Sequence, residues 1–223
     1  MKNKIILDLC GGTGSWAKPY KEAGYNVITI TLPEYNVMAF DIIGDHIIFY
    51  GTESKYNLEI RLDAIYGILA APPCTMFSFA RTHAKKPRDL REGMETVMAC
   101  LNIIWACQYR LKNQYAQKPT LKFWALENPN GHLKFFLGKP ALIFDPYEYG
   151  DMYSKKTHVW GWFNEPIKTH GKEARILKNK FDKLSMKEIK SIGDNIFRDK
   201  NTRQELRSIT PKGFAEAFYK ANK

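Results

Sequence analysis

The chain has 223 residues, 44% of them hydrophobic, which suffices for one well-packed domain of ordinary size. Its four cysteines (Cys10, Cys74, Cys100 and Cys107) form no CxxC pair, and no signal peptide or long apolar span precedes or interrupts the sequence. This composition excludes a disulfide-stapled secreted scaffold and a membrane-spanning protein, and it indicates a reduced, cytoplasmic protein with no membrane partner.

Positive charge is unevenly distributed along the chain. The formal net charge is +11. Residues 1–163 contribute +4 of it, and residues 164–223 contribute +7. A basic surface of this kind suggests a polyanionic partner, although it also occurs for solubility alone. We therefore expect the last quarter of the chain to make most of the contacts with a polyanion.

The first predicted unit is a strand, a glycine-rich turn and a helix. Lys4–Leu9 is apolar enough for a buried strand, Cys10–Trp16 (CGGTGSW) follows at once, and a helix is expected to end near Ala23. Such a turn presents bare backbone N–H groups and a helix N-terminus to a ligand, which favours a carboxylate or a phosphate. By itself the pattern is shared by nucleotide sites and S-adenosylmethionine (SAM) sites.

A second strand is predicted over Val27–Leu32. Dinucleotide sites usually have an acid near the end of this strand for the ribose hydroxyls. Here Thr29 and Thr31 stand there instead, and Glu34 comes only after Pro33. The expected ribose acid is therefore missing from its usual place.

Two further features precede the middle of the chain. Asp41 is expected after a turn, either as a polar contact for the ligand or as a solvated loop acid. Residues 46–50 and 58–62 alternate as in a β-hairpin around Gly51, to which the sequence assigns no chemistry.

A cysteine follows the next predicted strand. Ile65–Ala71 is a short apolar run closed by Pro72 and Pro73, so Cys74 comes where a buried strand opens into a loop. Ligands bind at this edge of open α/β sheets, and the prolines stiffen the turn. Free cysteines are usually small core residues, but this position favours a nucleophile over a structural cysteine.

The segment after Cys74 is basic and then helical. Thr82–Arg91 is either a loop that holds a phosphate backbone or a solvated connector. Glu92–Tyr109 has apolar residues at helical spacing, so Cys100 and Cys107 are expected in the core.

Another strand, Leu121–Leu126, is predicted to end at Glu127. That acid would lie at the same sheet edge as Cys74, and a carboxyl group that stays protonated there could act as a proton donor. A lone glutamate more often caps a turn, but the pairing with Cys74 favours the catalytic interpretation.

Three motifs in this order, LDLCGGTGSW, AAPPCTMFS and ALENPNG, resemble the cofactor loop, the nucleophile loop and the ENP motif of DNA (cytosine-5) methyltransferases. Tyr147–Phe163 resembles a later strand motif of that family, and Arg207–Asn222 resembles its C-terminal helix, as in small phage-borne members. The resemblance leaves mainly residues 42–60 and 164–206 unmatched.

The resemblance implies a Rossmann-like, SAM-dependent α/β fold and a covalent mechanism at carbon 5 of cytosine. It makes Cys74 the nucleophile and Glu127 the acid, with Lys155 and Thr157 in the places of two arginines that surround the base in the family. Positive charge from Lys155 and Arg81 would favour the thiolate. The implied cofactor-binding residues are Asp8, Cys10, Gly11, Gly12, Thr13, Gly14, Asp41 and Pro72.

The implied partner is double-stranded DNA with a flipped-out cytosine, bound by a monomer. Residues 1–163 would form the catalytic domain, 164–206 a small lysine-rich recognition segment (Lys178, Lys180, Lys183, Lys187 and Lys190), and 207–223 a helix packing back on the catalytic domain. Two alternatives stay open, namely a non-catalytic DNA-binding descendant and an enzyme of the same fold that acts on RNA or a free nucleotide.

Overall fold

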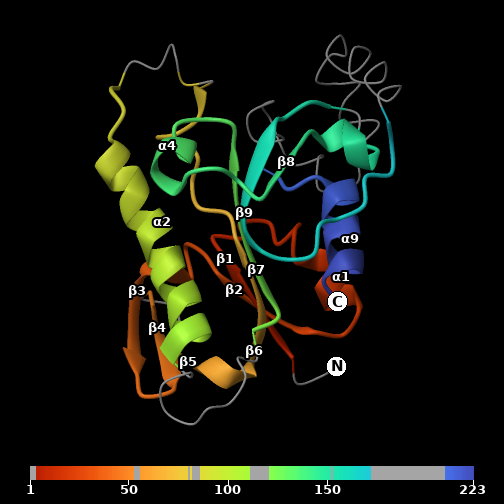
Figure 1. The fold of residues 1–223 in the computed structure, drawn as a ribbon. Coiled ribbons are helices and arrows are strands. Elements are labelled where there is room, and N and C mark those ends of the chain that lie inside the picture. The colour runs from red at the N-terminus through yellow and green to blue at the C-terminus, as the bar shows by residue number, and fades with distance from the viewer. Residues whose placement is uncertain are drawn as a thin grey trace.

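Two sheets organise the protein (Figure 1). The computed structural model describes residues 4–52, 56–79, 81, 86–110, 121–151, 153–171 and 209–223. Its central sheet contains β1 (Ile5–Leu9), β2 (Asn26–Ile30), β6 (Ile65–Ala70), β7 (Phe123–Pro129), β8 (Leu142–Phe144) and β9 (Thr157–Trp162). The strand order is β2-β1-β6-β7-β9-β8. The first four are parallel, whereas β9 runs antiparallel to both β7 and β8.

The four strands that the apolar runs predict are present within a few residues of their expected bounds. β7 differs most, because it continues through Glu127 to Pro129, where it pairs with β9. Glu127 therefore lies inside a strand, opposite Val159, and not in a loop after it. This pairing fixes its backbone more firmly than a turn would.

Helices cover both faces of the central sheet (Figure 1). The buried apolar residues form two clusters. α2 (Leu90–Trp105), which continues into the π turn η3 (Ala106–Arg110), belongs to the first, which we call the α2 cluster. α1 (Lys18–Glu22) and α9 (Lys212–Ala221) belong to the second, which we call the α9 cluster. Alternation along β1 divides the core, since Leu7 packs into the α2 cluster and Ile6 into the α9 cluster. Across the described helices, none is long and apolar enough to span a membrane.

A separate antiparallel sheet contains β3 (Tyr35–Ile43), β4 (His46–Gly51) and β5 (Leu58–Arg61). The predicted hairpin is confirmed as β4 and β5, and the sequence did not predict β3. The expectation that Asp41 follows a turn is wrong. It lies within β3, where its exposed carboxylate accepts a hydrogen bond of 2.6 Å from the hydroxyl of Tyr50.

Short helical turns complete the described chain: η1 (Leu62–Ala64), α4 (Lys134–Leu137) and η4 (Pro146–Tyr149). The turn at η4 binds two distant segments. The Glu148 carbonyl accepts hydrogen bonds from the backbone of Thr169 and His170, and the Asp151 carboxylate accepts one from the Gly213 backbone. Residues 172–208, with the five lysines of the expected recognition segment, lie outside the described residues.

Candidate active site at the carboxyl edge of the sheet

The glycine-rich turn after β1 is folded tightly against β2. The backbone N–H of Cys10 donates to the Ile30 carbonyl over 2.8 Å, and Gly14 donates to the Gly11 carbonyl over 2.9 Å. Gly12 and Gly14 have positive φ angles, as does Cys10 at 56°. Because a positive φ is uncommon for a residue with a side chain, Cys10 is a strained position at the start of the turn.

Asp8 lies beneath this turn. Only 1% of the residue is exposed, and among the described residues neither carboxyl oxygen has a hydrogen-bond partner. Burial raises its pKa to about 7. A side chain at Gly11 would collide with this carboxyl group, so the glycine is needed for the turn to cross directly over Asp8.

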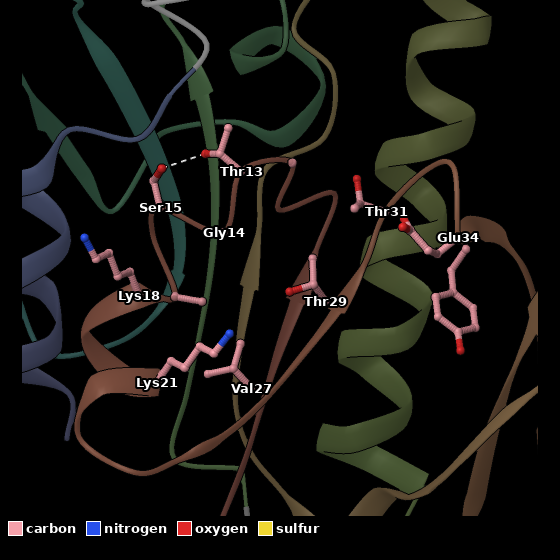
Figure 2. Close-up of a pocket in the computed structure, with 12 residues that line it drawn as sticks. Thr13, Gly14, Ser15, Lys18, Lys21, Val27, Thr29, Thr31 and Glu34 are labelled. Carbon is pink, nitrogen blue, oxygen red and sulfur yellow. Dashed lines mark hydrogen bonds between the residues drawn. The ribbon is translucent and has the colours of Figure 1, made fainter. Parts of the chain in front are cut away.

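A cleft of about 520 Å³ opens beside the turn (Figure 2). In Figure 2 Lys18 and Lys21 of α1 lie on one side of it, and Thr31 and Glu34 lie on the other. Its lining consists of Gly12, Thr13, Gly14, Ser15, Ala17, Lys18, Lys21, Val27, Thr29, Thr31, Glu34 and Tyr35. Asp41 is not among the lining residues. The volume is in the range of small-molecule and cofactor sites.

Glu34 lines the cleft, although its position in the sequence, after Pro33, did not predict this. It lies beyond the end of β2, yet the chain between β2 and β3 returns it to the cleft with Thr29 and Thr31. The cleft therefore has a carboxylate on the side of β2, although β2 itself contains no acid. The signal in the sequence was an acid that follows the second strand by a few more residues than usual.

Cys74 lies on the loop that follows β6. Its carbonyl oxygen accepts hydrogen bonds from the backbone of Phe77 (3.0 Å) and Ser78 (2.8 Å), which close a tight turn. The buried side-chain amide of Asn128 donates to the Pro72 carbonyl over 3.0 Å. The loop that bears the cysteine is therefore attached directly to the strand that bears Glu127.

A second set of contacts joins the same two segments. The backbone N–H of His132 donates to the Phe77 carbonyl over 2.8 Å, and Ser78 forms a β-bridge with Gly131. A side chain at Gly131 would collide with the Phe77 carbonyl, so close approach requires glycine there. The loops after β6 and β7 thus form one connected unit.

Lys155 reaches this unit from the residues before β9. Its Nζ lies 3.7 Å from Oε1 of Glu127, and each side chain is only 9% exposed. Within the described residues, Oε2 of Glu127 has no hydrogen-bond partner. The start of an antiparallel strand lies beside the end of its neighbour, so the reversed direction of β9 delivers the lysine to this edge.

The three residues also influence one another electrostatically. Burial raises the pKa of the Cys74 thiol above its ordinary value, Lys155 opposes this shift, and Glu127 adds to it. The net direction is upward, so the nearby cation does not outweigh burial. Arg81, also expected to favour the thiolate, instead donates to the backbone carbonyls of Lys86 and Pro87.

Thr157 and His158 lie on β9 next to this centre. The Thr157 hydroxyl donates to the Lys155 carbonyl over 2.7 Å, so this side chain fixes the backbone that carries the lysine. His158 is buried opposite Asn128, and burial, with Lys134 and Lys156, lowers its pKa. Thr157 therefore supports Lys155 and brings no charge of its own.

The described sheet and its two helical layers define a mixed α/β protein with a mostly parallel central sheet. No protein-family model and no curated protein matches the chain. Among solved structures, one similar chain is the methyltransferase EhMeth of Entamoeba histolytica, at 14% identity and a TM-score of 0.34. The match covers 73% of this chain and 53% of EhMeth, so this chain spans about half the length of that protein.

Proposed function

We propose that the protein is a SAM-dependent methyltransferase with a Rossmann-like sheet, which methylates carbon 5 of cytosine in DNA. The observation that supports this most directly is the meeting of Cys74, Glu127 and Lys155 at one edge of the sheet. These residues come from three separate segments, and the order of their motifs is that of the DNA (cytosine-5) methyltransferases they resemble.

The cleft beside the glycine-rich turn suits SAM in size and in chemistry. SAM, when bound, supplies an electrophilic methyl group. The turn from Gly11 to Gly14 would hold its amino-acid end by backbone groups, with Lys18 and Lys21 near the carboxylate. Glu34 would accept hydrogen bonds from the ribose hydroxyls, which is the part an acid near the second strand usually has.

Cys74 and Glu127 perform complementary steps on the cytosine ring. The thiol of Cys74 loses its proton, and the sulfur forms a bond to carbon 6. The electrons of the C5–C6 double bond move to C4–C5, and those of C4–N3 move to ring nitrogen 3, which takes a proton from the Glu127 carboxylic acid. Carbon 5 is then nucleophilic. After methylation the N3–C4 double bond re-forms as ring nitrogen 3 returns its proton to the Glu127 carboxylate. A base then removes the carbon 5 proton, the C5–C6 double bond re-forms and the thiolate leaves.

Lys155 acts on the nucleophile through its charge. It lowers the pKa of Cys74 against the effect of burial, so it increases the thiolate fraction available for addition. Because Glu127 is buried and Cys74 half-buried, a cytosine must leave the DNA stack to reach them both. Double-stranded DNA is therefore the proposed substrate, and the enzyme extrudes the target base.

Bisulfite sequencing of DNA from cells that express the protein tests this function. Wild-type protein should protect cytosines within a recurring sequence from conversion, and Cys74→Ser should protect none. DNA binding without any protected cytosine would contradict the proposal and favour the non-catalytic descendant. SAM-dependent methylation of RNA alone would transfer the activity to another nucleic acid.

A further inference from the structure

A small exposed surface next to the catalytic loops combines aromatic rings with a lysine. Phe79, His132, Lys134 and Phe135 form it, and we call it the aromatic–lysine patch. The Lys134 Nζ lies 5.4 Å from the Phe79 ring centre and 5.3 Å from that of Phe135, and the His132 ring lies 4.9 Å from Phe79. Phe135 is 70% exposed and Phe79 39%, so both residues contribute to the surface of the protein.

The aromatic–lysine patch belongs to the same unit as the catalytic residues. Phe79 is on the loop that bears Cys74, and His132 is on the segment after Glu127. The bridge between Ser78 and Gly131 joins these two segments immediately beside the patch. Anything bound at the patch would therefore lie close to a substrate at Cys74.

The two segments that carry the patch are basic, which favours a polyanionic partner. Residues 75–88 and 129–144 contain six lysines and arginines and no aspartate or glutamate: Arg81, Lys85, Lys86, Arg88, Lys134 and Lys139. Lys156, just before β9, is also exposed, and it acts together with Lys134 on buried His158. A nucleic acid strand fits this environment because its phosphates pair with lysines and its bases stack on aromatic rings.

We propose that the aromatic–lysine patch stacks an unpaired nucleobase of the DNA strand on Phe135 and Phe79 and holds the adjoining phosphate through Lys134. This proposal rests on the proposed function, because DNA is the substrate at the neighbouring site. It adds a second contact for the strand, outside the pocket for the target cytosine. Stacking tolerates any base, so the patch increases affinity for opened DNA without reading its sequence.

Fluorescence anisotropy with two labelled duplexes tests the proposal, one fully paired and one of the same sequence with a single unpaired adenine, a base that the pocket for the target cytosine does not take. Wild-type protein should prefer the duplex with the unpaired base. Phe135→Ala and Phe135→Leu should weaken binding to it about 5-fold to 100-fold, whereas Phe135→Trp should keep the wild-type affinity. Lys134→Gln should reduce the salt slope of binding by about one unit, a change that Phe135→Ala should not cause.

Two matched controls lie at the opposite edge of the sheet. Trp162 at the end of β9 is 60% exposed, and Lys4 lies over the Tyr66 ring, so each resembles a patch residue in type. Trp162→Ala and Lys4→Gln should leave affinity and salt slope unchanged. Thermal unfolding of each variant verifies that it is folded.

The outcomes separate this proposal from the proposed function. Wild-type affinity in Phe135→Ala would overturn the stacking proposal, even if the protein methylates DNA. Full affinity in Phe135→Leu would also overturn it, because an aliphatic side chain offers no ring on which a base can stack. Binding that depends on Phe135 without any SAM-dependent methylation would support the patch and refute the proposed activity.

Discussion

Lys155 Nζ and Glu127 Oε1 lie 3.7 Å apart in a pair of side chains that are both 91% shielded from solvent. The pair exists because β9 runs opposite to β7, so that the beginning of one strand meets the end of the other. Removing Lys155 from this pair alters the electrostatics of Cys74.

Lys155→Met should raise the pKa of Cys74 further, because Lys155 is the group that lowers it. Alkylation of Cys74 by iodoacetamide, followed by peptide mass spectrometry across pH, should need a higher pH in the variant, since the thiolate is the reactive form. Lys155→Arg keeps the charge and should stay near the wild-type profile. Lys156→Met, on the exposed neighbour, is the control, and an equal shift there would mean that Lys155 has no specific effect.

Duplex DNA containing 5-fluorocytosine should trap the covalent intermediate of Cys74. Fluorine at carbon 5 cannot leave as a proton would, so in the presence of SAM the adduct should survive denaturing electrophoresis. Cys74→Ser should abolish it, because a hydroxyl is far less ionised than a thiol at neutral pH. Glu127→Gln should slow it strongly, because an amide cannot supply the proton to ring nitrogen 3.

Cys100 and Cys107 provide the matched controls for the trapping experiment. Both are buried in the α2 cluster. The Cys100 side chain is hydrogen-bonded to that of Cys10, and serine keeps a hydrogen-bonding group there, so serine at either position should leave the adduct in place. If the wild-type protein binds SAM and DNA yet forms no adduct on any sequence that it methylates, covalent catalysis by Cys74 is refuted.

Asp8 should make stability fall as pH rises from about 4 to about 7. The folded protein keeps this proton up to about pH 7, whereas the unfolded chain releases it near the ordinary value of 3.8. The stabilisation is complete below the unfolded pKa and is lost as pH rises through the folded pKa. At about 1.4 kcal/mol per pKa unit, the loss amounts to a few kcal/mol.

Asp8→Asn removes this titration while keeping the shape of the side chain. Urea unfolding at about pH 5 and about pH 8 should show a smaller decline for the variant than for the wild type. Asp63→Asn is the control, since the hydrogen bond from Arg61 lowers the pKa of Asp63, so this carboxyl titrates below the range compared and its replacement should leave the decline unchanged. An unchanged decline in Asp8→Asn would mean that Asp8 is ionised throughout this range.

Glu34→Gln should weaken SAM binding about 10-fold to 100-fold. Hydrogen bonds to a charged group contribute about 1.5–3 kcal/mol, and an amide oxygen is a poorer acceptor for ribose hydroxyls than a carboxylate. Isothermal titration calorimetry measures the change, with Glu95→Gln on the exposed face of α2 as the control. Equal affinity in both variants would remove Glu34 from the cofactor site.

The sequence predicts the strands and the long helix well because their signals are local. Ile5–Leu9 and Ile65–Ala70 are apolar runs bounded by glycine or proline, so composition alone marks them. Residues 35–43 also lie between a proline and a glycine, but Asn36 and Asp41 interrupt the apolar pattern. The strand there depends on pairing with His46–Gly51, which only the tertiary fold specifies. Asp41 was misplaced for the same reason.

The candidate site likewise contains some features with a local sequence signal and others that depend on the tertiary fold. Cys74 and Glu127 follow short apolar runs, so their meeting at one edge could be expected from parallel strands. The contact between Asn128 and Pro72 depends on the path of two loops, and the position of Glu34 depends on the turn after β2. Neither path has a local sequence signal, so only the tertiary structure shows these two contacts.

The turn at η4 receives the chain on both sides of residues 172–208. Thr169 and His170 bind it through Glu148, Gly213 binds it through Asp151, and the side chain and backbone of Asn164 bond to Asn222 and Ala221. The two described ends are therefore held together whatever the length of the chain that joins them. Insertions or deletions between them should leave the described sheet and the arrangement of Cys74 and Glu127 unchanged.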